Sequence, residues 1–303
     1  VSQVLGFGLG VQNTGKLQNR GWEFTLGYHN KAGAFTYNIT SNFSIINNKV
    51  LDLGVGDITQ PNGMIGNGSS LFIGYPMDLY YGYVADKLFS SADDIKNWPD
   101  MTKVNPDPQP GDIRYKDISG PDGKPDGKVD PTYDRTVIGS TIPKYTYGIS
   151  FNIGYKGFDL SALVQGVAHV NGQLTSYAGY AFYNTATIQQ WMADDHWSAA
   201  NPNPNAKYPR LEVIPNAGTP NTAISSFWIL NASYLKIRNI QLGYTLSDKL
   251  MKRSGISSLR FYVSAENPVT WSKYAPGFDP EINTSGGYYP ILAAYTFGVN
   301  LSL

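Results

Sequence analysis

The residues with the clearest chemistry in this sequence are carboxylates in one acidic stretch, residues 117–134. Glycine follows aspartate in two turns, Asp122-Gly123 and Asp126-Gly127. Calcium takes several oxygen ligands, and an EF-hand-type loop spaces its acids at alternate positions around a central glycine. The stretch is therefore the best candidate for a metal site.

The spacing matches a calcium loop only in part. Counting from the first aspartate of the turns, Lys124 and Tyr133 stand where acidic ligands are expected. A solvated Asp/Gly turn explains the same residues, so both interpretations stay open. We expect the protein to require no cofactor, with calcium as the one candidate metal. The predicted ligands are Asp122, Asp126, Asp130 and Asp134.

A second group of candidates consists of aromatic side chains in stretches without strand periodicity. They are Tyr80, Tyr81, Tyr83, Trp98, Trp191 and Trp197. Such rings stack on sugars or pack against a partner, and they equally fold a loop onto itself. Long irregular connections are uncommon unless they are functional or disordered. The sequence therefore favours ligand binding by some of these rings.

Signatures of catalysis are missing from the sequence. His29, His169 and His196 have no paired ligand at a helical or hairpin spacing, and Asp194-Asp195-His196 lacks a third partner for acid–base work. There is no nucleophile elbow, zinc-protease motif or phosphate-binding loop. We predict that the protein is not an enzyme.

Composition excludes further classes. The 303 residues carry 23 basic and 23 acidic side chains, which removes the electrostatic basis for nucleic-acid binding. Charged residues make up 15% of the chain, against about a quarter in soluble domains. The chain contains no cysteine, which excludes disulfide scaffolds and thiolate metal sites. No apolar run approaches the roughly 18 residues of a membrane-spanning helix.

The elements that must position these side chains are predicted to be β-strands. Every odd residue from Tyr145 to Tyr155 is aromatic or aliphatic, and every even residue is Thr, Gly, Ser or Asn. Period two gives a strand one apolar face and one polar face. A phase slip between Ile237 and Ile240 predicts a bulge. Similar segments are 22–28, 36–45, 158–170, 228–246, 259–265 and 295–303.

The connections between these seven segments alternate in length. The long ones are residues 47–143, 171–227 and 272–290. In an antiparallel meander they all lie at one end of the sheet. Short turns at one end, long loops at the other and strands of about ten residues are typical of a transmembrane β-barrel. A soluble β-sandwich is the alternative, because its strands also alternate.

A series of short motifs runs along the whole chain. They are NRGWE at 19–23, YGY at 81–83, GDIRYKD at 111–117, DRTVIGS at 134–140, NASYLKIRNIQLGY at 231–244, DPE at 279–281 and YTFGVNL at 295–301. Their order and spacing resemble the SusC/RagA family of TonB-dependent outer-membrane transporters of Bacteroidetes. Residues 121–124 look like an insertion into the compact acidic loop of that family.

This resemblance implies an all-β fold, in which residues 1–303 are the C-terminal part of a transmembrane barrel, seven strands with long extracellular loops. The plug domain of such a receptor is absent from this chain. The resemblance further implies a protein in the outer membrane, surrounded by its lipid, that imports glycans or oligopeptides. A SusD-like surface lipoprotein would deliver the cargo, and TonB would supply energy through the missing N-terminal part.

A second function class stays open from the residues alone. The chain would then be a soluble or surface-attached carbohydrate-binding β-protein, or a glycoside hydrolase whose two carboxylates converge on a cleft. The two classes differ in what lies against the apolar face of the strands. Lipid is expected for the transporter, and a second protein layer for the sandwich.

Overall fold

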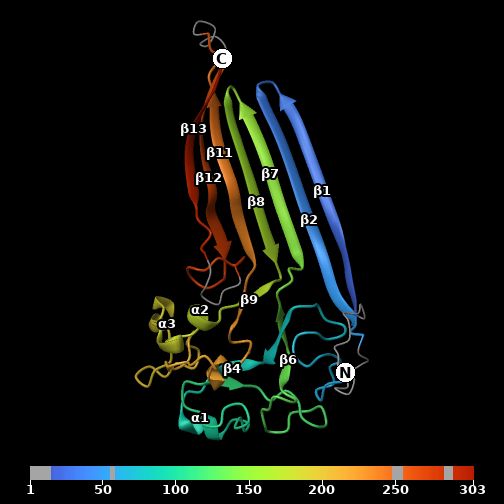
Figure 1. The fold of residues 1–303 in the computed structure, drawn as a ribbon, viewed down its shortest axis with the longest axis vertical. Helices are drawn as coiled ribbons and strands as arrows, with labels where there is room; N and C mark the ends of the chain where they lie inside the picture. The colour runs from blue at the N-terminus through green and yellow to red at the C-terminus, as the bar shows by residue number, and fades with distance from the viewer. Residues whose placement is uncertain (1–14, 55–58, 248–254, 283–288) are drawn as a thin grey trace, which may run out of the picture.

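The computed structural model describes residues 15–54, 59–247, 255–282 and 289–303. Its main element is a seven-stranded antiparallel sheet whose strands follow one another in chain order (Figure 1). The strands are β1 (Lys16–Ala32), β2 (Phe35–Asp52), β7 (Tyr145–Tyr155), β8 (Phe158–Ala168), β11 (Tyr234–Thr245), β12 (Ser258–Ser272) and β13 (Ala294–Ser302). All seven predicted strands and their meander order are confirmed. Their lengths run from 9 residues in β13 to 18 in β2, enough for tilted strands to cross a bilayer.

The predicted bulge is also confirmed. The register of β11 shifts between Ile237 and Asn239 against both of its neighbours. Ile237 lies opposite Val164 and Ile240 opposite Ala162, so both isoleucines stay on the apolar face although three positions separate them. The extra residue, Arg238, is thereby free to share the other face with its second neighbour, Lys236.

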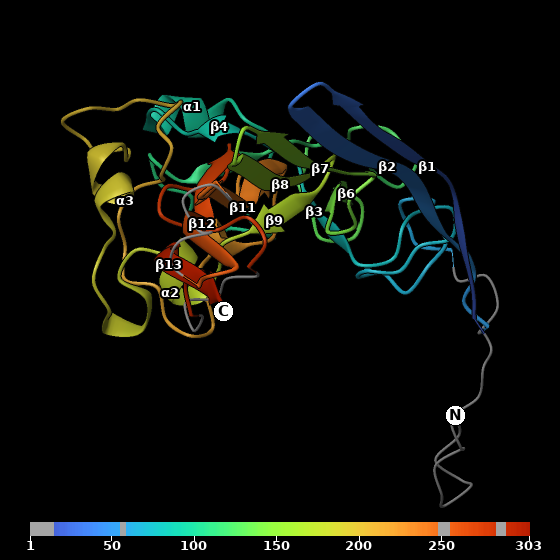
Figure 2. The same ribbon diagram turned by 90° about the horizontal axis from the view of Figure 1, so that it is seen from above.

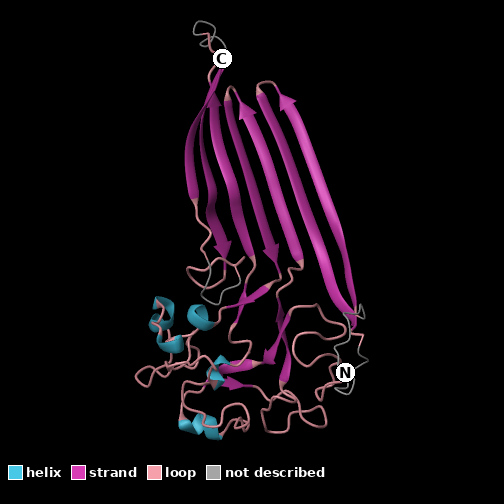
Figure 3. Ribbon diagram, in the orientation of Figure 1, coloured by secondary structure: helices cyan, strands magenta, loops and turns pink. Residues whose placement is uncertain are grey.

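All the other elements of the described chain lie beyond one end of the sheet (Figures 1 and 3). They come from two connections, residues 53–144 and 169–233, which we call together the loop cap. Its elements are β3 (Leu79–Tyr83), β4 (Ala85–Leu88), α1 (Ala92–Lys96), β5 (Ile113–Tyr115), β6 (Arg135–Ser140), β9 (Asn171–Gln173), α2 (Ser176–Gly179), η2 (Tyr183–Thr185), α3 (Gln190–Asp194), η3 (Pro220–Thr222) and β10 (Ile229–Asn231). At the opposite end, two-residue turns join β1 to β2 and β7 to β8.

One face of the large sheet is apolar and exposed. Trp22 is 70% exposed, Leu26 74% and Phe297 83%. The register continues this face across the sheet, because Trp22 lies opposite Ile45 and Ile45 opposite Tyr145. Neither the helices nor the small sheets of the described chain cover it (Figure 2). This is the surface expected of strands that face hydrocarbon rather than a second protein layer.

The hydrophobic core lies in the loop cap and not against the sheet. Its fully buried side chains include Leu88, Phe89, Ile113 and Met192. None of the helices in the described residues is long and apolar enough to cross a membrane.

Candidate functional site

The loop cap is the candidate functional site, because it is the irregular part of the chain that packs into a defined shape. Stacked and edge-on aromatic pairs form much of its interior. The rings of Tyr83 and Tyr115 stack with centroids 4.9 Å apart, and Tyr208 meets Trp191 and Trp228 edge-on at 5.8 and 5.6 Å. Each of these pairs lies within one connection, and the larger hydrophobic cluster to which they belong contains residues of both connections of the cap.

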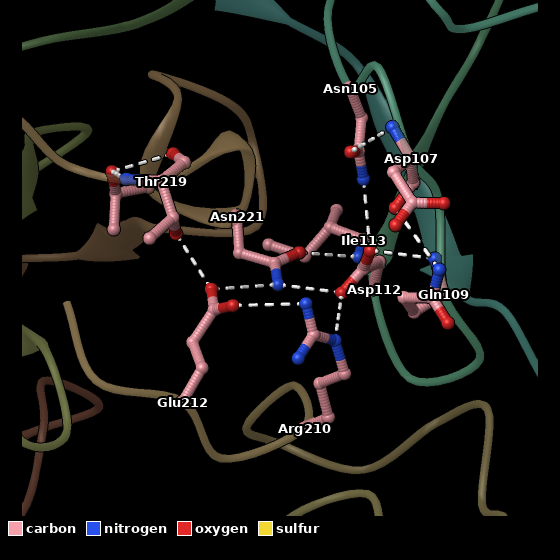
Figure 4. A network of polar contacts seen from close by, with 10 residues as sticks. Asn105, Asp107, Gln109, Asp112, Ile113, Arg210, Glu212, Thr219 and Asn221 are labelled. Atoms are coloured by element: carbon pink, nitrogen blue, oxygen red, sulfur yellow. Dashed lines mark hydrogen bonds and ion pairs between the residues drawn. The ribbon is translucent and has the colours of Figure 1, made fainter.

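A buried carboxylate organises the polar part of the cap (Figure 4). Asp112 is 1% exposed. Its Oδ1 accepts hydrogen bonds from Arg210 Nε at 2.5 Å and Asn221 Nδ2 at 2.8 Å. Its Oδ2 accepts from Asn105 Nδ2 at 2.8 Å and from the Gln109 backbone N–H at 2.9 Å. Four donors therefore replace the water that this carboxylate has lost.

The same network joins the two connections of the cap. Asn221 also accepts from the Ile113 backbone N–H at 2.9 Å, and Glu212 pairs with Arg210 at 2.9 Å. Glu212 further accepts from Thr219 Oγ1 at 2.6 Å. No sequence pattern marks these residues as a group, although Asp112 lies within the motif at residues 111–117.

The backbone that leads into Asp112 requires a glycine at position 111. The φ of Gly111 is +90°, and a Cβ atom there would lie 2.4 Å from the Trp197 ring. We expect Gly111→Ala to destabilise the cap by roughly 1–3 kcal/mol, because it adds both backbone strain and a clash. The urea midpoint of the full-length protein, followed by tryptophan fluorescence, measures this effect.

Gly123→Ala is the matched control. Gly123 also has a positive φ, +77°, but a Cβ there would meet nothing within 4 Å. Its substitution tests backbone strain alone. Equal losses from the two variants would show that the contact with Trp197 does not matter.

The predicted ligand-binding aromatics lie mostly inside the cap. The structure brings Tyr83, Trp98, Trp191 and Trp197 into one cluster. Tyr81 packs on Phe72 in a separate cluster, with ring centroids 4.6 Å apart, and Tyr80 is half-buried. Ligand binding by these rings stays a prediction, and packing of the cap is the role that the contacts show.

Two of these aromatics have polar contacts of their own. Trp98 donates from Nε1 to the Tyr115 carbonyl at 2.8 Å, and the Arg114 guanidinium lies 4.2 Å from the centre of its ring. Trp191 donates to Gln189 Oε1 at 2.9 Å. These bonds fix the orientation of both indoles within the cap.

Burial also fixes the ionisation of tyrosines in the cap. It raises the pKa of Tyr83 to about 12 and that of Tyr180 to about 12, because a phenolate would lose its hydration. Both phenols are therefore neutral at physiological pH and unsuited to act as bases there.

Asp130 and Asp134 of the acidic stretch accept hydrogen bonds from backbone N–H groups. Asp134, 1% exposed, accepts from the N–H groups of Ile118 at 2.7 Å, Ser119 at 3.1 Å and Asp130 at 2.8 Å. Burial raises the pKa of Asp134 above its ordinary value in spite of these bonds. Asp130 accepts from the Thr132 N–H at 2.8 Å and forms an ion pair with a neighbouring lysine at 3.1 Å.

The other two predicted calcium ligands are exposed. Asp122 and Asp126 each accept the backbone N–H two residues later, at 3.0 Å. In the described part of the chain, no group of three or more His, Asp or Glu side chains is arranged to hold a metal ion. The structure thus shows two backbone-capping carboxylates and two turn carboxylates rather than one assembled site.

The three histidines lie in different surroundings. His29 is exposed on β1, and the ring of His169 contacts that of Tyr145 with centroids 5.3 Å apart. His196 Nδ1 lies 2.8 Å from the Ala193 carbonyl oxygen.

Comparison with known proteins gives matches that extend over nearly the whole of this chain. No protein-family model matches it. TonB-dependent receptor P3 of Formosa agariphila is 27% identical over 312 residues, which cover 96% of this chain and 29% of the relative. TonB-dependent receptor SusC of Bacteroides thetaiotaomicron is 24% identical over 306 residues, covering 97% of this chain and 27% of SusC.

Solved structures agree with these sequence matches. A structure of the RagAB peptide transporter superposes on 99% of this chain and 31% of its own, with a TM-score of 0.71 and 21% identity. The RagAB peptide importer in its open-open state gives the same TM-score, 0.71, at 22% identity. The chain thus spans less than a third of the length of the proteins it matches.

Proposed function

We propose that this chain is the C-terminal barrel portion of an outer-membrane importer of the SusC/RagA family, because it is 27% and 24% identical to two TonB-dependent receptors over nearly all of its length and has the fold of RagAB. The observation that carries this proposal is the apolar face of the large sheet, which the described chain leaves uncovered. The opposite face, with residues such as Asn42, Ser150 and Gln241, would line a wet lumen.

The loop cap supports the second part of the proposal, a partner and a cargo at the outer mouth. Its core and its Asp112 network give a fixed surface that a SusD-like lipoprotein would meet. RagAB, one of the matched structures, is described as a peptide transporter, so oligopeptides are a cargo to test beside glycans. TonB would act through segments outside this chain. The role proposed for the chain itself is transport and not catalysis.

The decisive experiment uses the full-length protein. Migration on detergent gels that changes on heating, together with uptake of a labelled oligopeptide or glycan that depends on TonB, is the expected result. Recovery of the folded protein in the soluble fraction without detergent would instead favour the carbohydrate-binding alternative.

Calcium dependence of the acidic stretch is tested separately. Lys128 is an exposed site for trypsin, whereas the bond after Lys124 resists trypsin because Pro125 follows it. We expect millimolar calcium to leave the cleavage rate at Lys128 within about twofold, since the four carboxylates are not assembled into one site. A bound ion at 100-fold over its dissociation constant would stabilise the loop by about 2.7 kcal/mol and slow cleavage roughly a hundredfold. Chelation with EDTA after calcium addition is the control.

A further inference from the structure

The connection from β12 to β13 folds back over the polar face of the sheet. Its described part that follows β12, residues 273–282, is called the strap. The strap contacts β11 at Lys236. Lys236 lies opposite Gln165 of β8, on the polar face of the sheet. Lys236 is entirely buried there, although the hydrophobic core of the described residues lies in the loop cap.

Two carboxylates of the strap neutralise this lysine. Lys236 Nζ lies 2.7 Å from Asp279 Oδ2 and 2.6 Å from Glu281 Oε2. Glu281 also pairs with Arg238 and accepts a hydrogen bond from the Tyr234 hydroxyl. The two carboxylate side chains are 16% and 19% exposed. The contact is therefore a largely desolvated group of two cations and two anions.

The ionisation of Glu281 is fixed by its partners. Burial raises the pKa of this carboxyl, but the bonds from Lys236, Tyr234 and Arg238 outweigh burial and hold the pKa below its ordinary value. The cluster is thus held by charge at neutral pH.

The strap has a second anchor in the loop cap. Tyr274, 8% exposed, clusters with Leu174, Ala178 and Ala232, and Phe278 packs against the same group. A cavity of about 360 Å³ is lined by the strap, by the end of β12 and by Pro290 and Ile291. The strap is therefore held at two points and borders an open space.

We propose that the strap is a releasable latch over an anion site. Lys236 and Arg238 bind carboxylates, the chain's own Asp279 and Glu281 occupy this site in the conformation described, and acidic cargo competes with them. The inference rests on the proposed importer function, because only in a barrel does the polar face of the sheet meet cargo. Displacement at the Tyr274 anchor would weaken the ionic anchor as well, since the same short segment carries both.

Cysteine labelling tests the latch. The chain has no cysteine of its own, so Ala275→Cys, which is half-buried within the strap, gives one reactive thiol in this region. Maleimide labelling is measured on the full-length protein, with any cysteines elsewhere replaced. We expect Lys236→Met to raise the labelling rate by about tenfold or more, because it leaves two largely desolvated carboxylates without their shared partner. Glu281→Gln should also raise the labelling rate. It is the variant to use if the Lys236→Met protein does not assemble.

Lys273→Met is the matched control, because Lys273 is an exposed lysine of the same strap. It should change the labelling rate by less than about twofold. An oligoglutamate peptide should speed labelling of the wild-type strap, and an oligoglutamine peptide of equal length should not. Unchanged labelling in both cluster variants, or equal effects of the two peptides, would overturn the proposal. Uptake is measured on the same samples, so a protein that imports cargo without a moving strap refutes the latch and leaves the importer function standing.

Discussion

Ile149→Arg is expected to prevent stable assembly of the barrel. Ile149 lies in the middle of β7 and is 44% exposed on the apolar face. An arginine facing lipid near the bilayer midplane costs about 2–4 kcal/mol, because its charge leaves water without gaining a partner. The amount of heat-modifiable protein in the outer membrane measures the loss, and urea unfolding in lipid vesicles gives its size.

Ser150→Arg is the matched control for this prediction. Ser150 is the next residue of the same strand and points to the polar face. An arginine there meets the lumen, so we expect assembly close to that of the wild type. If both variants assembled equally well, hydrocarbon would not lie against the apolar face, and the importer function would lose its main support.

Asp112→Ala is expected to have the largest effect within the loop cap. It leaves the Arg210 guanidinium and the Asn221 and Asn105 amides without their shared acceptor. The loss should lie below the roughly 3–5 kcal/mol of a fully buried pair, because the Arg210 side chain is 32% exposed and keeps its ion pair with Glu212. The urea midpoint of the cap should fall, and affinity for the proposed lipoprotein partner should fall with it.

Asp107→Ala provides the comparison in the same segment. Asp107 is exposed, and its carboxylate forms no hydrogen bond or ion pair with the residues that the structure describes. Its removal should shift the midpoint by less than about 0.5 kcal/mol. A cap that tolerates Asp112→Ala equally well would show that its two connections fold without the buried network.

The strands could be predicted from the sequence because their information is local. Period two is visible in residues 145–155 alone, and the phase slip at Ile237 marks a bulge without any knowledge of the neighbouring strands. The length of the connections then fixes which end of the meander is elaborated. These features depend on backbone geometry and on a single burial direction.

The interior of the cap could not be predicted in the same way. Asp112 and Arg210 are 98 positions apart in sequence, and neither stretch has a period that indicates the other. The chemistry of aromatic side chains suits ligand binding, but burial gives Tyr83 and Trp197 a packing role that the sequence alone cannot distinguish from it. Likewise, the spacing of the four aspartates suggests a shared ion, whereas nearby N–H groups already use Asp134.

The bond between Asp112 and Arg210 has a consequence for biogenesis. If the strands cross the membrane as proposed, both connections of the cap must be translocated to the cell surface before they can meet. The first of them therefore waits, incompletely folded, until β8 has been inserted and the second has followed. Packing of the two connections against each other would then follow the insertion of β8, and a variant arrested at that stage would carry formed strands beneath a protease-sensitive exterior.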